Sequence, residues 1–174
     1  MDFEPFPKMA RLSRQCIITE KLDGSNAQIA ISDDGTEIKA GSRTRWITPG
    51  KSTDNFGFAR WVQDNKEELL KLGPGRHFGE WWGQGIQRGY DMKERKFSLF
   101  NVSRWSDNRP TCCDVVPTLW VGEFDTVEVD NTLHVLHVDG SKASPGFMKP
   151  EGIIVYHIAA GVGFKKTFDD NHKG

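Results

Sequence analysis

The chain has 174 residues, 37% of them hydrophobic, and a formal net charge of −1, which predicts one globular domain without the strongly basic character typical of nucleic-acid-binding domains. Its cysteines, Cys16, Cys112 and Cys113, have neither the number nor the spacing of a disulfide framework or a zinc site, which favours a reducing compartment. No signal-peptide pattern and no run of about 18 apolar residues is present, so we expect an intracellular protein of the cytoplasm with no membrane partner.

The first quarter of the chain predicts a lead-in followed by three short strands. Residues 1–15 mix proline, phenylalanine and basic residues without periodicity, and we expect this lead-in to pack across the domain. Alternating and apolar runs predict strands at 16–21, 25–32 and 36–42. Because the connections are short, we expect these strands to form an antiparallel meander.

Lys21 stands at the junction between the first two of these strands. A lysine at a sharp, rigid junction is well placed to react, and Gly24 would let a ligand or another backbone approach closely. Read alone, the pair Asp23-Gly24 is also typical of an ordinary hairpin turn. Arg43 lies just beyond the third strand, near the level of Lys21, where it could face a phosphate.

The middle of the chain predicts scaffold elements. An apolar stripe after the cap residues at 52–54 predicts a helix over 55–72. Strands are expected at 77–82 and 96–102. The glycines at 83–89 do not complete a dinucleotide-binding loop, so we interpret them as a flexible turn.

The last third predicts three strands and one ambiguous segment. Strands are expected at 115–121, where Pro117 favours a sheet edge, at 152–158 and at 163–168. The segment 126–138 fits a strand by composition and a helix by spacing, and we favour the helix.

His134 and His137 lie within this segment, and no third ligand follows at a recognisable spacing. We therefore interpret both histidines as structural.

Six short stretches occur in the order found in one superfamily. Lys21-Leu22-Asp23-Gly24 resembles the nucleophile motif of the covalent nucleotidyltransferases, which are the DNA ligases, RNA ligases and mRNA capping enzymes. The other five resemble the later motifs of that superfamily: Ser42-Arg43, Phe78-Gly79-Glu80, 97–102, 151–155 and 164–167.

Within the superfamily, two features resemble the small phage-type ATP-dependent RNA ligases. These are Asn26, five residues after Lys21, and the segment 140–152. The resemblance implies an α+β fold of two packed antiparallel β-sheets with flanking helices, here a single adenylyltransferase domain over 1–174 with no appended OB-fold or C-terminal domain. It also implies a phage-encoded enzyme in a host cytoplasm, with the oligomeric state left open.

The resemblance implies a three-step reaction. Lys21 would attack the α-phosphate of ATP to form a lysyl-AMP, the AMP would pass to a 5′-phosphate end, and a 3′-hydroxyl would then displace it. Because an amine attacks only when neutral, cations such as Arg43 and Lys165, or a bound metal, would favour the neutral form. Lys165 and Mg²⁺ or Mn²⁺ would also stabilise charge on the phosphate.

The resemblance assigns the other site residues by their chemistry. Phe100 would stack on adenine, Glu80 would accept hydrogen bonds from the ribose, and Glu151, with Asp23, would hold the metal. Adjacent residues of a strand point opposite ways, so only one of Lys165 and Lys166 can enter the pocket, and we favour Lys165. The expected nucleotide-binding set comprises Glu20, Lys21, Asn26, Arg43, Glu80, Phe100, Glu151, Lys165 and Lys166.

A ligase without a further domain must hold nucleic-acid ends, RNA more than DNA, with its own surface. The candidates are Arg43, Arg45, Trp46, Arg88, Lys93, Arg95 and Lys96. Two alternatives stay open: a GTP-dependent capping-type guanylyltransferase, and a module that binds nucleotides or RNA ends without turnover.

Overall fold

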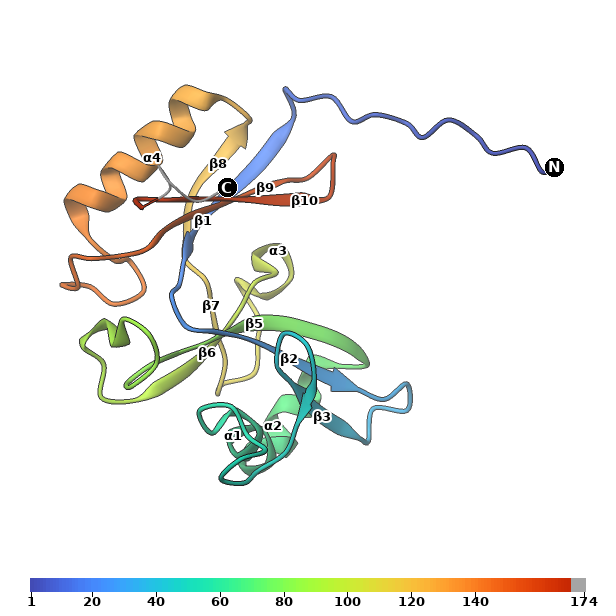
Figure 1. Ribbon diagram of the computed structural model, residues 1–174, viewed down its shortest axis with the longest axis vertical. Coiled ribbons are helices and arrows are strands. Elements are labelled where there is room, and N and C mark those ends of the chain that lie inside the picture. The colour runs from blue at the N-terminus through green and yellow to red at the C-terminus, as the bar shows by residue number, and fades with distance from the viewer. Residues whose placement is uncertain (170–174) are drawn as a thin grey trace.

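The computed structural model describes residues 1–169, and within this range the strands form two sheets that lie one above the other (Figure 1). Neighbouring strands are antiparallel except β6 and β7, which are parallel. The four-stranded sheet has the order β10 (Val162–Thr167), β9 (Gly152–His157), β1 (Gln15–Lys21), β8 (Thr118–Glu123). The six-stranded sheet has the order β4 (Trp46–Ile47), β3 (Ile38–Gly41), β2 (Ser25–Ile31), β5 (Gly75–Gly83), β6 (Arg95–Leu99), β7 (Asp114–Val115).

Helices cover the outer face of each sheet (Figure 1). α4 (Thr126–Asp139) packs Val129 and Leu136 onto the four-stranded sheet, so the helix expected at 126–138 is confirmed. Under the six-stranded sheet lie α1 (Phe58–Asp64), α2 (Lys66–Leu69) and η1 (Leu70–Leu72), while α3 (Val102–Trp105) and η2 (Gly89–Asp91) lie in connections. The predicted α+β architecture of two sheets with flanking helices is therefore confirmed.

The expected meander of the first three strands is wrong, because β1 and β2 belong to different sheets. Leu22 is buried with Trp82 and Tyr90 in a small core between the sheets, and it draws the chain across. Gly24 then passes so close to β5 that a Cβ there would collide with the carbonyl oxygen of Trp81. Lys21 therefore stands where the chain leaves one sheet for the other.

Three expected elements are interrupted. The helix at 55–72 breaks at Asn65, whose side-chain amide bonds to the carbonyl oxygen of Trp61. The strand at 96–102 ends at Leu99, because Asn101 caps α3. The strand at 115–121 divides at Pro117 into β7 and β8, one at an edge of each sheet.

The lead-in does not pack across the domain as expected; it extends away from it (Figure 1). Phe3, Phe6 and Met9 are 79–90% exposed, and contact begins at Leu12, whose carbonyl oxygen lies 2.8 Å from Nε2 of His157. Within residues 1–169, no helix has both the length and the apolar character needed to cross a bilayer.

Candidate active site

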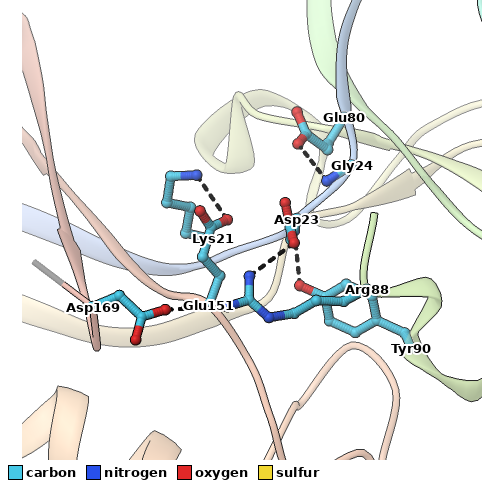
Figure 2. A network of polar contacts seen from close by, with 8 residues as sticks. All are labelled: Lys21, Asp23, Gly24, Glu80, Arg88, Tyr90, Glu151 and Asp169. Carbon is cyan, nitrogen blue, oxygen red and sulfur yellow. Dashed lines mark hydrogen bonds and ion pairs between the residues drawn. The ribbon is translucent and has the colours of Figure 1, made fainter. Parts of the chain in front are cut away.

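Lys21 lies at the end of β1, directly opposite Gly152 at the start of β9. This register brings Glu151 beside the lysine, with Glu151 Oε2 2.8 Å from Lys21 Nζ (Figure 2). The two side chains are 23% and 20% exposed, so the pair is half-buried and still open to solvent. A Cβ on Gly152 would collide with the carbonyl oxygen of Lys166, so this position needs glycine for β10 to pair closely.

The alternation of β1 decides which side chains accompany Lys21. Cys16 and Ile18 point into the core under α4, whereas Ile17 and Thr19 line a cavity between the two sheets. Lys21 continues the second set, because side chains two residues apart on a strand share a face.

Lys165 and Lys166 point to opposite faces of β10, as expected. Lys165 pairs with Ile154, which lines the cavity, and Lys166 pairs with Ile153, which is buried under α4. Residues directly opposite in an antiparallel ladder share a face. Lys165 therefore lies on the cavity side, whereas Lys166 forms an ion pair of 2.5 Å with Asp130 of α4.

Asn26 and Glu80 lie opposite each other on β2 and β5 of the six-stranded sheet. Glu80 is 7% exposed, and its Oε2 accepts a hydrogen bond of 3.0 Å from the backbone N–H of Gly24 (Figure 2). Burial raises the pKa of Glu80 to about 7, against the opposing effects of the Gly24 bond and the charge of Lys21. The carboxyl can therefore act near neutral pH as a donor as well as an acceptor of hydrogen bonds.

A cavity of about 470 Å³ lies between the two sheets. Phe100, on the six-stranded side, and Ile154 and Thr19, on the four-stranded side, all line it. The sequence motifs indicated Phe100 but neither Thr19 nor Ile154. Because Ile153, Ile154 and Val155 are all apolar, the sequence carries no signal that shows which of them faces the cavity.

Arg43 lies in the turn after β3 and lines a second cavity of about 330 Å³, together with Asn26 and Phe100. Its side chain is exposed. Phe78 and Phe100 border both cavities, so the two cavities adjoin at these rings on the six-stranded sheet, and together they are called the cleft.

Asp23 is held in place by the connection that carries η2. Its backbone N–H donates to the hydroxyl of Tyr90 at 2.7 Å, and its Oδ2 lies 2.8 Å from Nη1 of Arg88 (Figure 2). Arg88 also lies 3.6 Å from Asp169. Tyr90 is fully buried, and burial raises the pKa of its hydroxyl, which therefore stays protonated.

Glu20 lines the cavity between the sheets, and its side chain anchors the loop before β9. Its carboxylate accepts hydrogen bonds from the hydroxyl of Ser141 and from the backbone N–H groups of Lys142 and Ala143, at 2.7–3.1 Å. The residue is 1% exposed. The carboxylate of Glu20 thus has a structural role, and the predicted nucleotide contact of this residue stays a prediction.

The carboxylates in residues 1–169 form no cluster that would hold a divalent metal by protein ligands alone. Within residues 1–169 no three histidine, cysteine or acidic side chains form a metal cluster, and His134 and His137 are exposed on α4. Mg²⁺ commonly binds through one or two carboxylates together with waters and substrate phosphates. Glu151 is paired with Lys21 and Asp23 with Arg88, each at 2.8 Å, so either carboxylate would have to share or exchange a basic partner to hold the metal.

The candidates for nucleic-acid contact divide into side chains that have protein partners and side chains that are exposed. Arg88 is paired with acids, and the guanidinium of Arg95 donates to the carbonyl oxygens of Gln84 and Phe56. Lys96 lies 3.7 Å from Glu94. The side chains of Arg43, Arg45, Trp46 and Lys93 are exposed.

Comparison with known proteins gives the same family as the motifs. A family model described as RNA ligase matches residues 14–167. Among curated proteins, no significant match is found.

Solved structures of the Naegleria gruberi RNA ligase are similar in fold. A mutant with ATP and Mn gives a TM-score of 0.69 at 22% identity, covering 91% of this chain and 51% of that one. A mutant with AMP and Mn gives 0.66 at 21% identity, covering 90% and 50%, and the ligase with PPi gives 0.65 at 22%, covering 89% and 50%.

The present chain thus spans about half the length of those structures. The family match, by contrast, takes in nearly all of it and confirms the resemblance found in the motifs. The chain belongs to the RNA ligase family.

Proposed function

We propose that this chain is an ATP-dependent RNA ligase that joins a 5′-phosphate end to a 3′-hydroxyl end through a lysyl-AMP on Lys21. The observation that carries the proposal is the convergence of Lys21, Glu151, Glu80 and the cavity between Phe100 and Ile154 at one junction between the sheets. Solved relatives hold ATP or AMP with Mn, which fits this arrangement.

The cleft supports one orientation of the nucleotide. Adenine would occupy the cavity between Phe100 and Ile154, where an aromatic face and a branched aliphatic side chain lie on opposite sheets. The ribose would lie toward Glu80, and the α-phosphate toward Lys21 and Lys165. Asn26 and Arg43 border the outer part of the same cleft and would contact the sugar and the phosphates.

Each proposed step exchanges one bond at phosphorus. First, Nζ of Lys21 bonds to the α-phosphorus as pyrophosphate leaves, and the amine releases its proton to solvent through the open side of the cleft. Second, an oxygen of the RNA 5′-phosphate attacks that phosphorus and the P–N bond breaks. Third, the 3′-hydroxyl oxygen attacks the 5′-phosphorus, its proton passes to solvent, and AMP leaves.

Glu151 is our proposed metal ligand, directly or through a water. A bound Mg²⁺ or Mn²⁺ would neutralise phosphate charge and favour the neutral amine. The cation of Lys165, fixed on the cavity face of β10, would stabilise the charge that develops on the phosphate oxygens.

We further propose that this unit ligates by itself and works in the cytoplasm. The described cysteines are unpaired, which suits a reducing compartment. Sealing of RNA by the purified 174-residue chain tests the first point, because a unit that needs further domains would form lysyl-AMP and stop there.

The decisive experiment incubates the protein with α-³²P-ATP and Mg²⁺ and measures the ³²P-labelled AMP that stays covalently bound to it. Wild type should retain AMP on the protein, Lys21→Ala should retain none, and Lys71→Ala, an exposed lysine paired with Glu68, should label normally. Label on the Lys21→Ala protein would refute the assignment of the nucleophile.

Nucleotide and substrate preference separate the alternatives. A capping-type enzyme would label from GTP in preference to ATP, and a binding module would bind ATP without labelling. Substrates with ribose or deoxyribose at the junction then test the preference for RNA.

A further inference from the structure

The six-stranded sheet carries a row of aromatic side chains that extends outward from the cleft. Trp46 pairs with Gly41, Gly41 with Gln28, and Gln28 with Phe78, whose carbonyl oxygen accepts the N–H of Phe100. Directly opposite residues in such a ladder share a face. Trp46, Phe78 and Phe100 therefore lie on one face of the sheet.

That face is the one that lines the active site. Phe78 stands two residues before Glu80 on β5, so both point the same way. Phe78 lines both cavities of the cleft. The aromatic row thus begins in the nucleotide site and ends at Trp46, on the edge strand.

These aromatic rings are exposed: Trp46 by 47%, Phe78 by 52% and Phe100 by 42%. Cations surround the outermost ring. Lys39 Nζ lies 5.7 Å and Arg76 Cζ 5.5 Å from the ring of Trp46, both within the range of cation–π attraction.

The cations of this face are not neutralised by nearby acids. Within residues 1–169 the side chains of Lys39, Arg43, Arg45 and Arg76 form no ion pair, unlike those of Arg88 and Lys166. Exposed aromatic rings between unpaired cations are the features that bind single-stranded nucleic acid, since bases stack on the rings and phosphates meet the charges.

Resting on the proposed function, we infer that Trp46, Lys39 and Arg76 form a platform for the single-stranded RNA that adjoins the end to be joined. One base stacks on Trp46. The phosphates contact Lys39 and Arg76, together with Arg43 and Arg45 in the turn after β3. A duplex is not suited to this surface, because its stacked bases do not present their faces.

The test measures binding of a 5′-phosphorylated single-stranded RNA of about 12 nucleotides by fluorescence anisotropy, beside AMP labelling of the same proteins. Trp46→Ala should weaken binding roughly 10- to 100-fold, and Trp46→Phe should restore most of it. Phe164→Ala, which removes an exposed ring on β10, serves as the matched control and should bind like wild type. AMP labelling should be unchanged in all three.

The charges are tested by salt. The double variant Lys39→Ala/Arg76→Ala should lower the slope of log K against log[salt] by about 1.4, because each phosphate that a cation no longer neutralises accounts for about 0.7. Equal binding by Trp46→Ala and wild type would overturn the platform, as would an equal loss in Phe164→Ala. The platform would also be overturned if polyglutamate displaced the labelled RNA as well as unlabelled RNA does, or if Trp46→Ala weakened binding of duplex RNA by the same factor. If no protein labels while Trp46→Ala still binds RNA more weakly, the platform stands and the proposed ligation fails.

Discussion

The two sheets differ in what they present to the cleft. The four-stranded sheet presents the groups suited to chemistry: Lys21 on β1, Lys165 on β10 and Glu151 directly before β9, with α4 packed on the other face of the sheet. The six-stranded sheet presents groups suited to recognition, such as Phe100, Glu80 and the platform at Trp46.

We infer that the four-stranded sheet carries the reacting groups and the six-stranded sheet binds the substrates. A reacting amine must be fixed within a fraction of an ångström, and Lys21 has this rigidity because it stands on β1, an interior strand of its sheet. Recognition of a flexible polymer tolerates exposed side chains near a sheet edge. Variants on each sheet should therefore fail in different ways.

Among the following variants, the largest effect is expected on the four-stranded sheet, at Lys165. Lys165→Ala should slow formation of the lysyl-AMP by roughly 10²- to 10³-fold, because a cation aimed at the developing charge is removed. Lys166→Ala is the matched control. Its ion pair with Asp130 is 45% and 65% exposed, so its loss should cost less than about 1 kcal/mol and leave the rate within a few-fold. Single-turnover labelling measures both, and a reversed order would exchange the two assignments.

A pH-dependent stability is expected on the recognition sheet, at Glu80. Burial raises the pKa of Glu80 from 4.5 to about 7, so the folded state holds this proton more tightly than the unfolded state. The resulting stabilisation is complete below pH 4.5 and is lost as the pH rises through about 7.

Denaturant unfolding at about pH 5 and about pH 8 measures this loss. Between these values the wild type should lose on the order of 2 kcal/mol that Glu80→Gln, which cannot ionise, does not lose. Parallel curves for the two proteins would show that Glu80 is ionised in the folded state throughout.

Much of the fold could be predicted from local patterns, and the errors have a common cause. Apolar runs located β1 and β9, alternation located β2, and helical spacing with a cap at Asp125 located α4. The change of sheet after Lys21 left no local signal, because it depends on Leu22 packing against Trp82 and Tyr90 from distant segments. The lead-in was misjudged for the same reason, since hydrophobic residues predict burial only where a partner surface exists.

The site shows the same limit. The motifs indicated Lys21, Glu151, Glu80 and Phe100. The first three lie close enough for their charges to interact, and Phe100 lines the cavity between the sheets. The motifs could not reveal that Glu20 is bonded to the loop at 141–143, that Arg88 is paired with Asp23, or that Ile154 faces the cavity. Each of these facts depends on register or on loop conformation, which one sequence does not specify.

The smallest effect is expected at Phe100 on the six-stranded sheet, where loss of ATP binding can be distinguished from loss of chemistry. Phe100→Ala should raise the KM for ATP by the loss of one stacking interaction, about 1 to 3 kcal/mol, because the ring borders the cavity proposed for adenine. The maximal rate of labelling should change much less, since Lys21, Glu151 and Lys165 stand on the other sheet. Phe164→Ala should leave KM unchanged. A fall in the maximal rate with KM unchanged would mean that the ring positions the reacting groups, and the division between the sheets would then be wrong.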